Sequence, residues 1–314
     1  MNAQRTAQTR PRDHDRVWQF DILVADGFVL TELSAIIEVL RITNRVCVKA
    51  PFSWTCRSRL GGDVESSGGA FVHSDPHAST PRADYMFVIG NSDPDDPALS
   101  VRDEIAKYTY RDAKVFLLAE AASRFISEGG DYSEPVTTHW ENLAFMRERD
   151  PLFEADDLIA AETQGIVTCA GMSATTDIVL SVVGHHVSSV ETATVADIML
   201  LDRVRAFDTR QVSQGRISQR SSDPLVNAAI DFMWGNLEDP VPIQELARKL
   251  GISLRSLERR FKGHLGYSPG GYFRELRLSH ANNLLLNTSL SIREIGLACG
   301  FTNGFTKQFR DIHG

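Results

Sequence analysis

The stretch IQELARKLGISLRSLERRF (residues 243–261) decides the fold of the last third of the chain, and IREIGLACGFTNGFTKQF (residues 292–309) repeats it. Each copy begins with apolar residues at helical spacing and includes a small residue where two helices must approach closely. A glycine, Gly251 or Gly300, then ends the first helix, and a second polar helix follows directly. The repeat predicts two helix-turn-helix units in one chain.

A helix-turn-helix unit places its second helix in the major groove of DNA. Two units in one chain predict a monomer that reads two successive major-groove segments. Residues between the two copies, around 270–286, predict a connecting helix that holds the units at a fixed separation.

The second helix of the first copy carries the candidate base contacts. Leu254, Leu257 and Phe261 lie at helical spacing and are predicted to face the core, while Ser253 can cap the helix. The residues between them point outward, and arginine binds guanine bidentately or holds phosphates. The candidate DNA-binding residues are Ser253, Arg255, Ser256, Arg259 and Arg260 in the first copy and Thr302, Asn303, Lys307 and Gln308 in the second. The alternative is a solvated helix face that happens to carry three arginines.

Charge is distributed unevenly along the chain. The net charge of the chain is −8. Residues 221–314 contain eleven Lys/Arg and nine Asp/Glu, a net charge of +2, so the remainder of the chain carries −10. This asymmetry is expected when only one part of a protein touches phosphates. The excess is modest, and an ordinary helical domain would also carry it.

Length and composition indicate an ordinary globular protein. The 314 residues, 42% hydrophobic and 24% charged, predict two domains, and no apolar run approaches the roughly 20 residues of a membrane helix. The first sixteen residues lack the apolar core of a secretory signal and are expected to be a disordered tail. The four cysteines (Cys47, Cys56, Cys169, Cys299) show no metal spacing and favour a reducing cytoplasm. We therefore expect a cytoplasmic protein without metal or cofactor.

Apolar strands alternate with helices over residues 17–205, which predicts βαβ units and a mainly parallel, doubly wound sheet of the flavodoxin type. The expected strands are 17–24, 52–60, 84–89, 113–118 and 165–169, with turns at 61–63 and 66–69. The expected helices are 30–46, a helix from about 120, and 173–187. A polar stretch without periodicity, residues 206–222, predicts a linker. Everything after it is expected to be helical, at 224–236, 243–250, 254–263, 270–286, 291–298 and 303–310.

The helical part resembles the DNA-binding domain of the AraC/XylS family over residues 222–314. The resemblance rests on IQELARKLGISLRSLERRFKGHLGYSP, YFRELRLSHANNLLLNTSLSIREIGLACGF and the closing FRDIHG. It implies a transcription regulator that binds promoter half-sites in double-stranded DNA and works with RNA polymerase. The second recognition segment departs from the family pattern: it is about two residues shorter and carries Gly304 within the short helix, at a cost of about 1 kcal/mol.

The first part resembles the DJ-1/PfpI-like (class I glutamine amidotransferase-like) domain that precedes such readers. The matching stretches are DILVADGFVLTELSAIIEVLRITNR, FVIGNSDPDD, VTTHWENLAFMRERDP and IVTCAGMSATTDIVLSVVGHH. The resemblance implies a homodimer and a small effector, a cationic amine or an amino acid. No membrane partner is expected.

Hydrolase chemistry is not expected at the site where enzymes of this family carry a nucleophilic cysteine. That cysteine lies on a sharp turn after the strand corresponding to residues 113–118, near a helix N-terminus that lowers its pKa. Here the region reads FLLAEA (116–121), with neither a cysteine nor the small residues such an elbow requires. The alternative is a hydrolase that uses Cys169, at a strand end before a helix. Free cysteines are, however, commonly small buried apolar residues.

Ligands of open α/β sheets bind at the carboxyl ends of the strands. The strand ends carry Asp26, Asn91, Ser92, Glu120 and Met172, to which Glu38 on the first helix can add, and a His-Trp pair could hold a cation. The candidate ligand-binding residues are Glu38, Asn91, Ser92, Glu120, His139, Trp140, Cys169 and Met172. A large core residue is the alternative for Trp140.

We therefore expect a disordered tail at 1–16, a sensor domain at 17–205, a linker at 206–222 and a DNA-binding domain at 223–314. The expected function is a transcription regulator in which a non-catalytic domain senses a small amine or amino-acid-like metabolite. Two rivals remain: an amidase or deglycase with an appended DNA module, and a helical half that binds protein rather than DNA.

Overall fold

A computed structural model describes residues 16–313 except 130–134, 151–152, 154, 156, 212–220, 289 and 302. The chain divides into two compact units. The first takes in Met1–His139 and Glu154–Arg210, and the second takes in Trp140–Phe153 and Gln211–Gly314. Most of the predicted tail and linker, residues 1–15 and 212–220, therefore lies outside the described residues.

An eight-stranded sheet forms the centre of the first unit, in the order β3-β4-β2-β1-β5-β6-β8-β7. The strands are β1 Trp18–Leu23, β2 Phe52–Ser58, β3 Leu60–Glu65, β4 Phe71–Pro76, β5 Tyr85–Val88, β6 Lys114–Leu118, β7 Ala160–Thr163 and β8 Ile166–Cys169. The six strands from β4 to β8 in this order are parallel, and β3 and β7 pair antiparallel at the two edges. The prediction of a mainly parallel, doubly wound sheet is confirmed.

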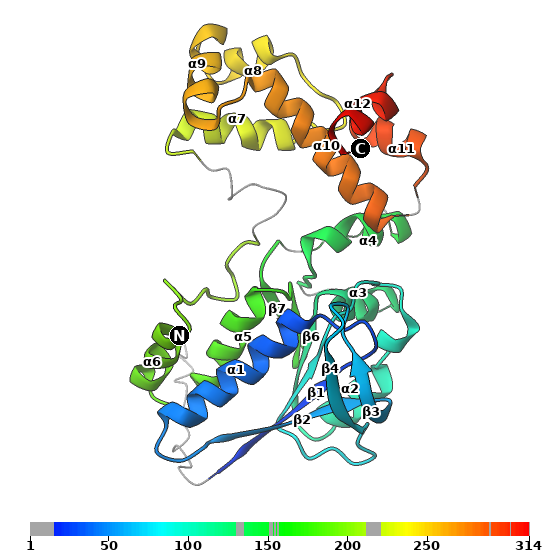
Figure 1. Cartoon of the computed structure of the whole chain (residues 1–314), viewed down its shortest axis with the longest axis vertical. Coiled ribbons are helices and arrows are strands. Elements are labelled where there is room, and N and C mark those ends of the chain that lie inside the picture. The colour runs from blue at the N-terminus through cyan, green and yellow to red at the C-terminus, as the bar shows by residue number, and fades with distance from the viewer. Residues whose placement is uncertain are drawn as a thin grey trace, which may run out of the picture. The chain divides into compact units, whose positions relative to one another are not determined.

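Helices cover both faces of this sheet (Figure 1). On one face lie α1 Leu30–Val46, α5 Ala174–Val183 and α6 Ser189–Ile198, and on the other lie α2 Arg102–Thr109 and α3 Ala119–Ser127. Alternation along β1 separates the two cores, because Ile22 packs with the α1 side and Leu23 packs with the α2 side. Two layers of helices therefore bury the apolar strands that the sequence predicts.

One turn prediction is wrong. Residues 61–63 do not form a turn, because they lie inside the edge strand β3 and pair with β4. Gly61 and Gly62 have φ values of +74° and +96°, which glycine adopts without strain, and Gly62 and Asp63 pair with Ser74 and His73 of β4. The predicted turn at 66–69 is confirmed between β3 and β4.

The second unit is helical and has two small cores on one long helix. Its helices are α4 Leu143–Arg149, α7 Pro224–Trp234, α8 Ile243–Lys249, α9 Leu254–Leu265, α10 Pro269–Asn287, α11 Ile292–Ala298 and α12 Phe305–His313, with the short turn η2 Trp140–Asn142. The first half of α10 supplies Tyr272, Phe273 and Leu276 to the core of α7, α8 and α9. Its second half supplies Leu278, Ala281 and Leu284 to the core of α11 and α12. The connecting helix predicted at 270–286 therefore packs against both helix-turn-helix units.

The segment Trp140–Phe153 belongs to the second unit although it interrupts the first in sequence. Its helix α4 contacts α10, and the Trp140 backbone N–H donates to Gln211 Oε1 over 3.0 Å. The first residues of the predicted linker belong instead to the first unit. Ile159 N–H donates to Thr209 O over 2.9 Å, beside the start of β7. Among the described helices, none has the length and apolar character needed to cross a bilayer.

Candidate DNA interface and ligand site

The first helix-turn-helix unit is formed by α8 and α9. Leu246 and Ala247 of α8 pack against Leu257 and Phe261 of α9, and all four are buried. Gly251 ends the first helix with a φ of +69°, a left-handed conformation that glycine adopts without strain. The Ser253 hydroxyl then accepts the Ser256 N–H over 3.2 Å and caps α9, as predicted.

Two arginines of α9 are free to meet a ligand. Arg255 and Arg259 lie one helical turn apart, and both are exposed. Neither has a hydrogen-bond or ion-pair partner among the residues that the structure describes. A guanidinium without an internal partner keeps its donors for base edges or phosphates.

Arg260 makes an intramolecular contact instead. Its guanidinium pairs with the Asp223 carboxylate, which also lies 3.6 Å from His264 Nε2 and accepts the Leu225 N–H at the start of α7. Burial is the largest single influence on the pKa of Asp223 and raises it. The hydrogen bond and charge of Arg260, together with the N–H groups of Leu225 and Val226, outweigh burial, so the pKa is lowered overall. Arg260 thus ties α9 to α7, and its predicted contact with DNA stays a prediction.

The second helix-turn-helix unit is built from α11 and α12. Ser291 and Glu294 form a reciprocal capping box that starts α11. Gly296 is where the two helices approach: a Cβ there would lie 3.3 Å from the Phe305 ring. One prediction is wrong here, because Gly304 does not lie within the recognition helix. It precedes α12 with a φ of +74° and so carries no cost as an interior helix residue.

The residues predicted to contact DNA in the second helix-turn-helix unit lie only partly among the described residues. Asn303 and Lys307 are exposed, Gln308 is half-buried, and Thr302 lies outside the described residues. Phe305 is buried and Phe309 packs against the same core, so the side of α12 with Lys307 faces away from it. Contact of these residues with DNA remains a prediction.

Sequence reasoning missed Arg277, which stabilises the turn between α11 and α12. Its side chain leaves α10, donates from Nη1 to Gly300 O over 3.1 Å and lies 4.4 Å over the Phe301 ring. Burial lowers the pKa of the guanidinium. The available signal was an arginine among the apolar residues of the connecting helix, which marks a partner carbonyl or ring.

In the first unit, a sharp elbow joins β6 to α3. The helix begins at Ala119 directly after Leu118, and Ala119 has a φ of +40°. The expectation that the region lacks the small residues of an elbow is therefore wrong: the elbow forms, with alanine at its tip. Such a conformation is costly for a residue with a side chain, and it persists only where the surroundings hold it.

A buried glutamate that sequence reasoning missed lies beside this elbow. Glu32 of α1 is fully buried and accepts the Gly90 and Met172 N–H groups, each over 2.9 Å. Burial is the main cause that raises the pKa of Glu32 to about 8, and the charge of Glu120 raises it further. Helical spacing was the available signal, because Glu32 lies four residues before Ile36 on the buried face.

The pKa of Glu32 predicts a pH dependence of stability. The folded protein keeps this proton up to about pH 8 while the unfolded chain loses it near 4.5. The stability contribution of Glu32 should therefore fall between about pH 5 and pH 8, by on the order of 4 kcal/mol. Thermal melting of the full chain and of Glu32→Gln from pH 5 to pH 9 measures this, since glutamine does not titrate.

Glu38→Gln on the same helix is the matched control. The Glu38 side chain is solvent-accessible and bonded to Arg41, which lowers its pKa, so the difference between this variant and the wild type should stay constant over this pH range. A gap between wild type and Glu32→Gln that is equally constant would contradict the raised pKa.

The structure brings three of the predicted ligand-binding residues around Glu32. Met172 donates to it, and the charge interactions of Glu120 and Cys169 with Glu32 place both nearby. The space is tight: a Cβ on Gly171 would lie 2.1 Å from Glu32 Oε1, and one on Gly90 would lie 2.3 Å from Glu120 Oε2. Binding of a ligand by these three remains a prediction.

The other predicted ligand-binding residues lie apart from Glu32. Glu38 on α1 is half-buried with a solvent-accessible side chain, and Ser92 is exposed in the loop after β5. His139 and Trp140 are half-buried at the point where the chain passes from the first unit to the second. No observation tests these assignments, which stay predictions.

Asn91 organises the loop after β5. It is buried, donates from Nδ2 to Asp96 Oδ2 over 2.6 Å and accepts the Asp93 N–H over 2.9 Å. Asp96 in turn accepts the Ala98 N–H at the start of the short turn η1 Pro97–Leu99. These bonds give the loop a defined shape.

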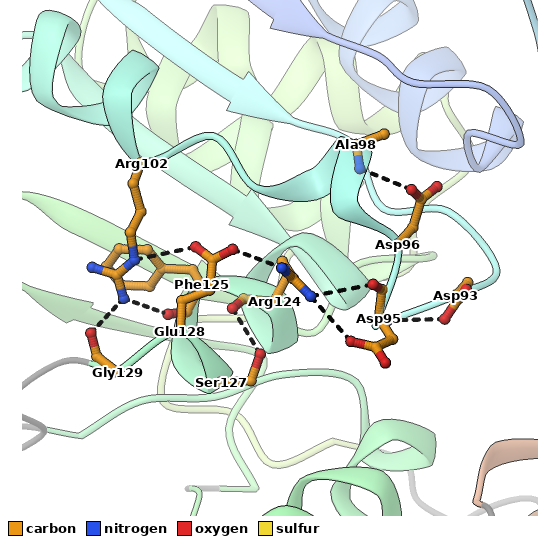
Figure 2. Close-up of polar contacts among 10 residues, drawn as sticks. All are labelled: Asp93, Asp95, Asp96, Ala98, Arg102, Arg124, Phe125, Ser127, Glu128 and Gly129. Carbon is orange, nitrogen blue, oxygen red and sulfur yellow. Dashed lines mark hydrogen bonds and ion pairs between the residues drawn. The ribbon is translucent and has the colours of Figure 1, made fainter.

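A row of alternating charges fixes this loop to α3 (Figure 2). Arg124 lies between Asp95 and Glu128, at 3.0 Å and 2.8 Å, and Arg102 at the start of α2 lies 3.1 Å from the other oxygen of Glu128. Arg102 also donates to the carbonyl oxygens of Phe125 and Gly129 at the end of α3. Asp95 and Arg102 are partly exposed, so each pair alone stabilises the fold little, but the shared guanidinium and carboxylate give the row a fixed geometry.

Known proteins resemble both parts of the chain. A model of the helix-turn-helix domain matches residues 246–314. The HTH-type transcriptional regulator GbdR of Pseudomonas aeruginosa is 28% identical over 311 residues, covering 93% of this chain and 81% of the relative. The HTH-type transcriptional regulator GlxA of Rhizobium meliloti is 25% identical over 313 residues, covering 96% of each chain. A solved AraC family transcriptional regulator from Pseudomonas putida shares the fold over 58% of this chain and 99% of its own, with a TM-score of 0.50 and 17% identity.

Proposed function

Because this chain is a DNA-binding transcription regulator of the AraC family, we propose that its α/β unit senses a small metabolite without transforming it. The sensed compound is a small amine or an amino-acid-like molecule. Its binding changes how α9 and α12 reach neighbouring promoter half-sites, as differential affinity for two arrangements requires. The regulator acts as a homodimer and works with RNA polymerase.

The observation that carries the non-catalytic part of this proposal is the alanine at the elbow. Ala119 holds the strained position at the start of α3, and a methyl group offers no nucleophile. Cys169, the alternative nucleophile, is fully buried, and burial raises the pKa of its thiol well above 9.0. A thiol in that state is neither accessible nor ionised at neutral pH.

The remaining thiols support the same conclusion. Burial raises the pKa of Cys47 to about 11 and that of Cys299 to about 12, and it also raises the pKa of Cys56. All four cysteines therefore have raised pKa values, whereas a reactive cysteine needs a lowered one.

Replacing Cys169 by alanine tests the proposal. The variant should bind promoter fragments and activate a reporter as the wild type does, and neither protein should hydrolyse L-glutamine or consume methylglyoxal. The matched control is Cys56→Ala, which removes a half-buried thiol from β2. Turnover of either compound by the wild type that disappears in Cys169→Ala, but not in Cys56→Ala, would replace the sensor by an enzyme.

A further inference from the structure

A cavity of about 700 Å³ opens in the first unit. Its lining comes from the carboxyl ends of β1, β2 and β5, from strand β3, and from η1 with the start of α2. The carboxyl ends of parallel strands are where open α/β sheets bind ligands, and this volume is typical of small-molecule sites. Asp26, one of the strand-end residues that the sequence suggested, lines it, whereas Glu32, Ala119 and the eight candidate ligand-binding residues do not.

The inner part of the cavity is apolar and rigid. Seven lining residues from strands and from the η1–α2 segment are buried: Leu23, Val24, Val64, Val88, Ile89, Leu99 and Val101. Buried side chains that belong to the packed core hold their positions, so the cavity keeps its shape without a ligand. This floor suits the hydrocarbon part of a small molecule.

The polar part of the lining is strongly acidic. The lining contains four carboxylates (Asp26, Asp63, Asp103, Glu104) and one guanidinium, that of Arg59. His77 adds no charge at neutral pH, because burial lowers its pKa below 6.5. The lining therefore carries a net charge of about −3, which attracts cations and repels anions.

Two of these carboxylates have no internal counter-charge. Glu104 is bonded to Lys107 over 2.9 Å, and Asp63 lies 2.8 Å from His73 Nδ1. Asp26 and Asp103 have no ion-pair or hydrogen-bond partner for their side chains within the described part of the chain. Their charge is therefore available to a cationic ligand.

The wall of the cavity is connected to the elbow helix. Pro97, Ala98 and Leu99 belong to η1, and the loop before η1 is held to α3 by the Asp95–Arg124 pair. From α3, the Ser123 hydroxyl lies 2.6 Å from Thr138 Oγ1, next to the residues where the chain enters the second unit. A ligand against η1 thus has a continuous set of bonded residues between it and that passage.

We infer that this cavity is the effector site and that it binds a small organic cation, such as a protonated amine, a guanidinium or a quaternary ammonium compound. The inference rests on the proposed sensing function and adds the place of the site. The cationic nitrogen lies among the acidic residues and the hydrocarbon part against the apolar floor. The elbow, with Glu32, is then a structural remnant.

Calorimetric titration of the full chain with three cations (putrescine, choline and L-arginine) tests the inference. At least one should bind, whereas 1,4-butanediol and succinate, the neutral and anionic counterparts of putrescine, should not. The double variant Asp26→Asn/Asp103→Asn should weaken binding at least tenfold. Ala98→Trp, which places a bulky ring at the exposed edge of the cavity, should abolish it.

The matched controls lie on α6, outside the cavity. Asp197→Asn and Ala193→Trp change an exposed carboxylate and an exposed methyl group, and both should bind the cation as the wild type does. Unchanged melting temperatures of all variants show that they fold. Equal binding by the cavity variants and the controls, preference for succinate, or no binding of any of the three cations would overturn the inference.

Promoter binding measured with and without metabolites separates this inference from the proposed function. A metabolite response that survives in both cavity variants removes the site and leaves the sensor in place. Turnover of the ligand by the wild type removes the proposed function itself.

Discussion

Replacing Gly300 by alanine is expected to destabilise the second helix-turn-helix unit by about 2–5 kcal/mol. The left-handed φ of +70° accounts for about 1–2 kcal/mol of this, as for any residue with a side chain. The rest is steric, because a Cβ there would lie 2.5 Å from Pro240 Cδ, 2.7 Å from Leu237 O and 2.8 Å from Glu238 O. Backbone atoms cannot move aside as a flexible side chain can, and overpacking of this kind costs about 1–3 kcal/mol.

The repeat itself supplies the control for this prediction. Gly251 ends the first helix of the first unit with a nearly identical φ of +69°, but a Cβ there would meet no atom within 4 Å. Gly251→Ala should therefore lose only the conformational part, about 1–2 kcal/mol. Urea unfolding of the full chain, followed by helical circular dichroism, compares the two variants. Equal losses at both glycines would show that the segment 237–240 does not restrict the second turn.

The same variant predicts a change in DNA binding. With α11 and α12 disordered by Gly300→Ala, affinity for a promoter fragment that spans two major-groove segments should fall to the affinity of the first helix-turn-helix unit (α8 and α9) alone. Gel-shift titration on a full site and on a half-site measures this. The two affinities should differ in the wild type and converge in Gly300→Ala.

The second large effect is expected at the two unpartnered arginines of α9. Arg255→Ala and Arg259→Ala should each weaken specific DNA binding by about 1–3 kcal/mol, or roughly fivefold to more than a hundredfold, if each binds a base edge. Since neither side chain has a partner within the described residues, both variants should melt like the wild type. Fluorescence anisotropy with a labelled promoter fragment gives the affinities.

Salt dependence distinguishes the two kinds of contact. A variant that loses a phosphate contact should lower the slope of log K against log salt by about one, whereas loss of a base contact should relax sequence preference at one position. Arg111→Ala, an exposed arginine of the first unit, is the matched control and should leave affinity unchanged. Arg260→Ala should instead lower the melting temperature, because it removes the guanidinium that pairs with the buried Asp223 carboxylate. Wild-type affinity in both Arg255→Ala and Arg259→Ala would place the DNA contacts elsewhere.

The sequence alone predicts the parts of the fold where periodicity and burial agree. The central strands are short continuous apolar runs, and α1 begins and ends at the residues of its amphipathic pattern. The two recognition units follow from repeated glycines at fixed spacing. These features are local, so a single stretch of sequence contains the information.

Features that depend on distant partners could not be predicted in this way. Strand β3 (LGGDVE) contains two glycines and is mostly exposed, so only its pairing with β4 makes it a strand. Strand β7 is short and pairs antiparallel with β8 at the other edge. The burial of Glu32 depends on backbone N–H groups from residues 58 and 140 positions away. Tertiary contacts therefore override local pattern at the sheet edges and beside the elbow.

The candidate site shows the same division. The cavity lies at the edge of the sheet to which the strand ends point, but it is also lined by residues from the antiparallel edge strand and from α2, which the sequence did not assign. In the enzyme family that the α/β unit resembles, the elbow carries the nucleophile, so its chemistry depends on one residue. With alanine at that residue, the family pattern does not identify the ligand site.

The segment Trp140–Phe153, with η2 and α4, belongs to the second unit although it interrupts the first in sequence. This arrangement restricts where hybrids between two regulators can be joined. A hybrid joined only at residue 210 would pair the carried-over α4 with a foreign copy of α10, while a fragment that starts at 211 would leave the α10 surface uncovered. Swapping specificities between relatives therefore requires moving residues 140–153 together with the reader. Exchange of the α/β part by a single crossover at residue 210 would meet the same constraint.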